Sequence, residues 1–164
     1  MKSANTITLT STFEVFESIN DLNDLDRLIL EEAQKAVGDA YAPYSNFNVG
    51  AALLLNNDKI ITGNNQENAA YPSGLCAERV ALFYANAKYP RVGVKAMAVT
   101  VKSNNQIIDE PVTPCGSCRQ VIAEYENLFE KPIRIIMTGQ TGKVIITQGI
   151  ENLLPLMFNK KHLK

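Results

Sequence analysis

The stretch GLCAER, residues 74–79, ends a loop and begins a predicted helix that runs over residues 76–88. A proline and a glycine just before the helix break regular structure. Towards the N-terminus, residues 49–55 and 59–63 are two predicted strands of a hairpin, because the Asn-Asn-Asp turn between them tolerates the left-handed backbone of a hairpin tip. Towards the C-terminus, residues 94–101 are rich in β-branched and apolar side chains, which predicts a further strand.

The same kind of pattern continues to both ends of the chain. Apolar residues recur at helical spacing over residues 24–37, and a proline-containing loop, 41–47, separates this amphipathic helix from the hairpin. The later predicted elements are a helix over 115–128, strands over 133–138 and 144–146, and a short terminal helix over 150–154. Helices that alternate with strands predict an α/β fold, a three-layer α/β/α sandwich with a mixed five-stranded sheet.

The organisation is that of one domain. The 164 residues contain no internal repeat, low-complexity segment or linker, and this length suits a single core. Residues 6–16 alternate polar and apolar types, so they could form an added edge strand or an ordered arm. We therefore expect a single domain over residues 1–164, with residues 1–23 as an N-terminal extension of unassigned role.

Composition narrows the class of function. Hydrophobic residues make up 46% of the chain and charged residues 20%, which is typical of globular domains. The net charge of −1 lacks the basic excess of a nucleic-acid-binding protein. No apolar run is long enough to span a membrane, and the first fifteen residues lack the apolar core of a signal peptide. These features predict a cytoplasmic protein that binds neither nucleic acid nor membrane.

All three cysteines lie at predicted helix starts. Cys76 is in GLCAER, and Cys115 and Cys118 are in PCGSCR, residues 114–119. A spacing of three puts two side chains on one helix face, and a helix N-terminus favours the thiolate. Three ligands would leave the fourth position of a zinc ion to water, which is the catalytic pattern. The alternatives are a redox pair, core packing, or a structural metal with a carboxylate as its fourth ligand.

Charged residues beside the cysteines suggest how such a site would work. Glu78, two residues after Cys76, could take the proton of a zinc-activated water without binding the metal. Three thiolates and one Zn²⁺ sum to −1, and Arg79 or Arg119 could offset this charge by donating hydrogen bonds to sulfur. His162 is the one histidine, and its place near the C-terminus makes it a poor candidate for catalysis.

Four segments resemble the cytidine deaminase family, in its small homotetrameric class. They are YAPYSNFNVGAA at residues 41–52, GNNQENAAY at 63–71, CAER at 76–79 and PCGSCRQ at 114–120. The resemblance covers roughly residues 24–158, and it includes the zinc-deaminase signature, in which the Glu is not a metal ligand.

The resemblance implies a reaction and a cofactor. The chain would be a zinc-dependent cytidine deaminase, a hydrolase acting on cyclic amidines in pyrimidine salvage. It would convert cytidine and deoxycytidine to uridine and deoxyuridine with release of ammonia, through attack of zinc-bound hydroxide at C4. One Zn²⁺ per chain would be held by Cys76, Cys115 and Cys118, and Glu78 would be the catalytic acid and base.

The resemblance also implies substrate contacts and shared sites. Asn65 and Glu67 would bond the ribose hydroxyls, and Phe47 would stack near the pyrimidine or the sugar. The backbone of Ala77 would bond the base edge of the small-molecule nucleoside. Phe158 would reach the site of a neighbouring subunit, which implies a homotetramer with shared active sites.

Two departures from the family pattern and two alternatives remain. Asn64 stands where many members carry a cysteine, and Leu156-Met157 replaces smaller residues before Phe158. A related enzyme could act on blasticidin, guanine or a polymer instead, although the Asn65 and Glu67 pair favours a free ribose. A non-catalytic, zinc-stabilised binding module is the other alternative, and the three-ligand count argues against it.

Overall fold

The computed structural model describes residues 4–163, so residues 1–3 and 164 of the expected domain lie outside the described residues. None of the helices in the described part is long and apolar enough to cross a membrane. The main elements are β1 (Glu14–Phe16), α1 (Asp24–Ala36), β2 (Phe47–Leu55), β3 (Ile60–Asn64), α2 (Ala77–Lys88), β4 (Val94–Ser103), α3 (Gly116–Phe129), β5 (Arg134–Thr138) and β6 (Val144–Gln148). These bounds confirm the expected order of helices and strands, while the expected terminal helix is a short 3₁₀ turn, Ile150–Asn152.

Within residues 4–163 the sheet is mixed and has six strands rather than the five expected. Its order is β1-β6-β5-β4-β2-β3, and only β4 and β5 run parallel. The sixth strand is β1, in which Glu14, Val15 and Phe16 pair with Ile146, Ile145 and Val144. The alternation over residues 6–16 allowed an added edge strand or an ordered arm, and the count of five left the strand out because period-2 alternation alone does not show whether a segment pairs with a sheet.

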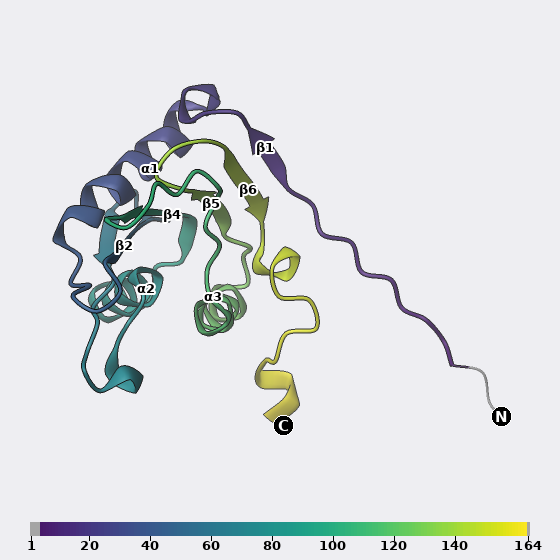
Figure 1. The fold of residues 1–164 in the computed structure, drawn as a ribbon. Helices are drawn as coiled ribbons and strands as arrows, with labels where there is room; N and C mark the ends of the chain where they lie inside the picture. Colours follow the sequence, from purple (N-terminus) through teal and green to yellow (C-terminus); the bar gives the residue numbers. More distant parts are fainter. Residues whose placement is uncertain (1–3, 164) are drawn as a thin grey trace.

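Helices cover both faces of the sheet, which confirms the three layers (Figure 1). Strand β2 shows why, since alternate residues point to opposite faces. Leu53 and Leu55 join the core beneath α2 and α3, which includes Leu82 and Ile122, whereas Leu54 and Ala52 join the core beneath α1. The near-continuous apolar run of β2 is therefore the mark of a strand buried on both sides.

Local sequence explains how several elements begin and end. The side chain of Asn23 accepts hydrogen bonds from the N–H groups of Leu25 and Asp26, which caps α1. In the hairpin between β2 and β3, Asp58 has a φ of 61°, so the turn has the left-handed backbone expected there. The helices α2 and α3 precede the parallel strands β4 and β5, so both helix N-termini lie at the same edge of the sheet.

Gly63 allows α2 to lie against β3. A Cβ at this position would stand 2.6 Å from the Ala81 nitrogen and 2.7 Å from the Ala77 oxygen, both of which are backbone atoms of α2. We expect Gly63→Ala to lower the free energy of unfolding by about 1–3 kcal/mol, because the helix must move away. Urea denaturation measures this change. Gly38→Ala is the matched control, since no atom lies within 4 Å of its Cβ, and equal stability of the two variants would contradict the argument.

Candidate metal centre and substrate cavity

The three cysteine sulfurs converge at the N-termini of α2 and α3. Cys76 and Cys115 are the residues just before these helices, and Cys118 is in the first turn of α3. The Cys115 Sγ lies 3.7 Å from the Cys76 Sγ and 3.6 Å from the Cys118 Sγ. A tetrahedral zinc ion with Zn–S bonds of about 2.3 Å holds its sulfurs about 3.8 Å apart. Both measured distances therefore match those between sulfurs that share a zinc ion.

The cluster holds three ligand atoms, all within 4.8 Å of one another, and no fourth His, Cys, Asp or Glu among residues 4–163 joins it. Cys118 is buried in the first turn of α3, Cys76 is half-buried and Cys115 is exposed. Cys76 and Cys115 also line a cavity. A tetrahedral metal at these sulfurs would therefore have one position free and facing that cavity, which is the arrangement of catalytic zinc sites.

The surroundings of the cluster favour negative charge on sulfur. Arg79 Nη2 donates to the Cys76 Sγ at 3.7 Å and to the Gly74 oxygen at 3.3 Å. A hydrogen bond with the Cys118 thiol, together with Arg79, lowers the pKa of Cys76 to about 5. The same hydrogen bond and burial raise the pKa of Cys118. A helix N-terminus adds to the stabilisation of each thiolate.

The sequence allows either Arg79 or Arg119 to donate a hydrogen bond to a sulfur, and the structure shows no such bond for Arg119. Its Nε donates to the Pro114 oxygen at 2.7 Å, Nη1 to the Leu153 oxygen at 2.7 Å, and Nη2 to the Thr113 hydroxyl at 2.9 Å. Arg119 therefore ties the loop before α3 to the segment after β6. Leu153 lies 34 residues further along the chain and Pro114 accepts through its backbone, so the local sequence carries no signal for these two contacts.

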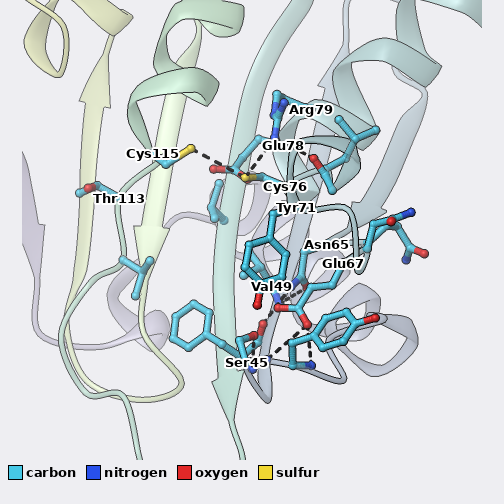
Figure 2. Close-up of a pocket in the computed structure, with 18 residues that line it drawn as sticks. Ser45, Val49, Asn65, Glu67, Tyr71, Cys76, Glu78, Arg79, Thr113 and Cys115 are labelled. Atoms are coloured by element: carbon cyan, nitrogen blue, oxygen red, sulfur yellow. Dashed lines mark hydrogen bonds between the residues drawn. The ribbon is translucent and has the colours of Figure 1, made fainter.

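Glu78 lies in the first turn of α2, and its side chain is buried and lines the cavity. Figure 2 shows Glu78, Arg79 and Cys76 together at one end of the cavity. Burial raises the pKa of the Glu78 carboxyl, because desolvation penalises its charged form. A carboxyl whose pKa is moved towards neutrality is suited to take up and return a proton.

The cavity has a volume of about 730 Å³, within the range of small-molecule sites. Its far end is polar and is formed by Ser45, Asn65 and Glu67 (Figure 2). Tyr44 and Tyr71 also line it and meet edge to face, with ring centroids 6.4 Å apart. Both tyrosines stand in segments that carried the family resemblance, but nothing in their spacing marked them as lining residues.

The two residues expected at the ribose lie side by side in different environments. The Asn65 amide bonds the backbone of β2, accepting from the Val49 nitrogen at 2.8 Å and donating to the Phe47 oxygen at 2.9 Å. Glu67 is open to the cavity, and its Oε2 accepts from the Tyr44 nitrogen at 2.8 Å. Asn65 thus fixes the strand beside the cavity, whereas Glu67 presents a carboxylate to it.

The remaining expected contacts divide into two groups. Phe47 lines the cavity, and Ala77 is buried at the start of α2, next to Cys76 and Glu78. Phe158 does not line the cavity of its own chain. Its ring is exposed and stacks on His162, with centroids 5.4 Å apart, and its carbonyl oxygen accepts from Gln120 Nε2 at 2.9 Å. The role of Phe158 at a neighbouring site stays a prediction.

Comparison with known proteins shows which family the chain matches. The family model described as "Cytidine and deoxycytidylate deaminase zinc-binding region" matches residues 23–129. A cytidine deaminase of Sporosarcina psychrophila is 42% identical over 140 residues, which cover 85% of this chain and 95% of the relative. A cytidine deaminase of Halalkalibacterium halodurans is 48% identical over 101 residues, or 61% of this chain and 72% of the relative.

A solved structure agrees with these relatives. The crystal structure of cytidine deaminase from Burkholderia pseudomallei superposes with a TM-score of 0.70 at 42% identity, covering 80% of this chain and 97% of that one. The matched family model spans both cysteine motifs, so zinc is the metal that the cluster holds. This chain belongs to the zinc-binding cytidine and deoxycytidylate deaminase family.

Proposed function

We propose that this chain hydrolyses free cytidine and deoxycytidine to uridine and deoxyuridine, with release of ammonia. Membership of the family makes it a zinc-dependent hydrolytic deaminase. The observation that carries the proposal is the meeting of three zinc-spaced sulfurs and one buried carboxyl, Glu78, at a cavity of nucleoside size.

The chemistry divides between the metal and the protein. Zinc, when bound at the three sulfurs, supplies a Lewis acid that makes a water molecule acidic enough to act as a nucleophile. Glu78 takes the proton of this water and gives it to N3 of the pyrimidine, as the water oxygen adds to C4. Glu78 then takes the remaining proton from the oxygen that has added to C4 and passes it to the amino nitrogen. The C4–N bond breaks, ammonia leaves, and the oxygen stays on C4 as the carbonyl of uridine. Arg79 holds charge on the Cys76 sulfur throughout, since it donates to that sulfur.

The charges of the cavity favour a nucleoside over a nucleotide. Its lining includes the carboxyl groups of Glu67 and Glu78, and Arg79 is the one cationic side chain that residues 4–163 contribute to it. The Nη2 atom of that guanidinium donates to the Cys76 sulfur and the Gly74 oxygen, at the end of the cavity opposite Glu67 (Figure 2). A phosphate on the ribose would therefore lie near the Glu67 carboxylate and away from Arg79. The ribose hydroxyls, in contrast, can donate hydrogen bonds to the half-buried Glu67 carboxylate, which lines the cavity.

A substrate panel tests this choice. We expect deoxycytidine 5′-monophosphate to show a kcat/KM at least about a hundredfold below that of deoxycytidine, because a like-charge contact costs several kcal/mol. We expect free cytosine, which lacks the ribose, to be a poor substrate as well. Ammonia release under identical conditions measures all three. A nucleotide that reacts as fast as the nucleoside, or preferential turnover of cytosine, would refute the assignment of Glu67 to a ribose.

We also propose that the chain acts as a homotetramer in cytoplasmic pyrimidine salvage, with Phe158 completing the site of a neighbour. Apolar side chains exposed on α2, α3 and the C-terminal segment support an assembly; they are Phe83, Tyr84, Leu128 and Phe158. Light scattering should give four times the chain mass of 18.1 kDa. Phe158→Ala should raise KM for cytidine in the intact assembly. A monomer that is fully active would rule out shared sites.

A further inference from the structure

The N-terminal arm, residues 4–13, runs away from the body of the molecule beyond β1 (Figure 1). Every residue of the arm is exposed, and in the described structure residues 4–11 make no hydrogen bond or ion pair. The arm has no charged residue and no proline, and threonine is its commonest residue. Such a segment has high strand propensity and offers open backbone groups, so it is a template for pairing with another strand.

One face of the arm is an apolar stripe. Ile7, Leu9, Phe13 and Val15 are 79%, 54%, 39% and 56% exposed. They occupy odd positions, which point to the same side of an extended strand, and only Ser11 interrupts them. The stripe continues from the arm into β1, whose Val15 lies opposite Ile145 of β6. The apolar face therefore extends from the sheet along the arm with nothing from its own chain over it.

In the same segment, backbone N–H and C=O groups of alternate residues point away from the body of the molecule. The Thr12 nitrogen donates to Asn152 Oδ1 and the Thr12 oxygen accepts from the Thr147 hydroxyl, each at 2.9 Å. Both backbone groups of Thr12 thus point towards the body. The backbone N–H and C=O groups of successive residues in a strand point to opposite sides. The backbone groups of Phe13 and Val15 therefore point away from the body of the molecule. Arg134 fixes the base of the arm, since its Nη1 bonds the Glu14 carboxylate at 2.8 Å.

We propose that two copies of this chain pair through residues 6–16 of their arms, antiparallel, about a two-fold axis at Ser11. In this register Ile7 lies opposite Val15 of the second copy, and Leu9 lies opposite Phe13. The odd-numbered residues have their backbone groups turned outward, so they exchange hydrogen bonds with the odd-numbered residues of the second copy. The one charged residue of the stretch, Glu14, faces Thr8 of the second copy and keeps its ion pair with Arg134. Two six-stranded sheets become one continuous sheet.

The partner is a second copy because the stripe is self-complementary. The order Ile7, Leu9, Ser11, Phe13, Val15 is symmetric in its apolar character about Ser11, which is what a two-fold contact requires. The S. psychrophila relative and the B. pseudomallei structure are matched over 95% and 97% of their own lengths, but over only 85% and 80% of this chain. None of residues 6–16 lines the cavity, so the pairing does not depend on the proposed reaction.

A cysteine at the two-fold axis tests the register. Opposed residues of a hydrogen-bonded antiparallel pair have Cα atoms about 5.5 Å apart, which is within disulfide range. We expect zinc-loaded Ser11→Cys, mildly oxidised, to form a covalent dimer on a non-reducing denaturing gel. Thr8→Cys, which is in the same arm but about 20 Å from its own copy at 3.4 Å per residue, should not. Wild-type protein controls for the three native cysteines, and cytidine turnover confirms that each variant is folded.

A second pair of variants tests the apolar contact. In the Ser11→Cys background, Leu9→Asp places a charge opposite Phe13 and should lower the rate of cross-linking about tenfold, since two cross-strand pairs are lost per dimer. Thr10→Asp adds the same charge on the other face and should leave the rate within about twofold. The proposal is overturned if Ser11→Cys gives no dimer, if Thr8→Cys cross-links equally well, or if Leu9→Asp has no larger effect than Thr10→Asp.

Discussion

Replacing Glu78 with glutamine is expected to lower kcat for cytidine by at least about 10⁴-fold, while one zinc ion per chain is retained. General acid–base catalysis alone contributes about 10²–10⁴-fold, and here one carboxyl moves protons both to the ring nitrogen and to the leaving amino group. The amide has nearly the same size, so the buried position of Glu78 in α2 tolerates it. Steady-state ammonia release and metal analysis on the same preparation measure both parts of the result.

Glu126→Gln is the matched control. Glu126 is a half-buried carboxylate of α3 whose pKa is also raised by burial, but its oxygens accept from the Ile133 and Ile150 nitrogens, and it does not line the cavity. An amide oxygen can accept the same bonds, so we expect near wild-type turnover. Turnover of Glu78→Gln at the wild-type level would exclude Glu78 as the proton carrier. Loss of zinc from Glu78→Gln would instead show that Glu78 is a ligand.

Replacing Cys118 with serine is expected to remove both the metal and the activity. Cys118 is fully buried and its sulfur lies 3.6 Å from the Cys115 sulfur, so a hydroxyl at this point cannot supply the third thiolate. Mutation of residues that only hydrogen-bond to metal ligands already weakens metal affinity about 10–100-fold. Removal of a ligand itself should therefore lower the affinity for zinc by more than a hundredfold. Zinc per chain after dialysis against a weak chelator measures the loss. We also expect a lower melting temperature, because bound metal stabilises the folded state.

Ser117→Ala controls for disturbance of the first turn of α3. Ser117 is next to Cys118, is exposed, and makes no side-chain hydrogen bond in the described structure. We expect it to keep its zinc and its turnover. Retention of one zinc ion per chain by Cys118→Ser would show that the metal is held elsewhere, and the open-site argument would then fail.

Most of the site could be predicted from the sequence, because local signals define it. Helix starts placed Cys76, Cys115 and Cys118 where helix dipoles favour thiolates, and short spacings put Glu78 and Arg79 next to them. The structure brings these residues together as expected. The hairpin turn at Asp58 and the amphipathic α1 were likewise visible, since each depends on neighbours a few residues away.

Long-range contacts explain what the sequence could not predict. The sixth strand depends on pairing between Glu14–Phe16 and a strand about 130 residues later. Whether Arg79 or Arg119 reaches a sulfur depends on where Leu153 and Thr113 lie. The bonds of the Asn65 amide to β2 are a contact that no local pattern encodes, and the expected role of Asn65 at the ribose stays a prediction. Phe158 lies outside the cavity of its own chain, so its role depends on a second subunit.

Zinc K-edge X-ray absorption on the purified protein tests the central claim most directly. We expect one zinc ion per chain with three sulfurs at about 2.3 Å and a single light atom at about 2.0 Å. If the zinc ion of Glu78→Gln has the same three sulfurs and one light atom, the light atom belongs to solvent and not to the Glu78 carboxylate. A fourth sulfur, a histidine nitrogen, or a zinc site that loses its light atom in Glu78→Gln would show that the fourth position belongs to the protein and would contradict the account.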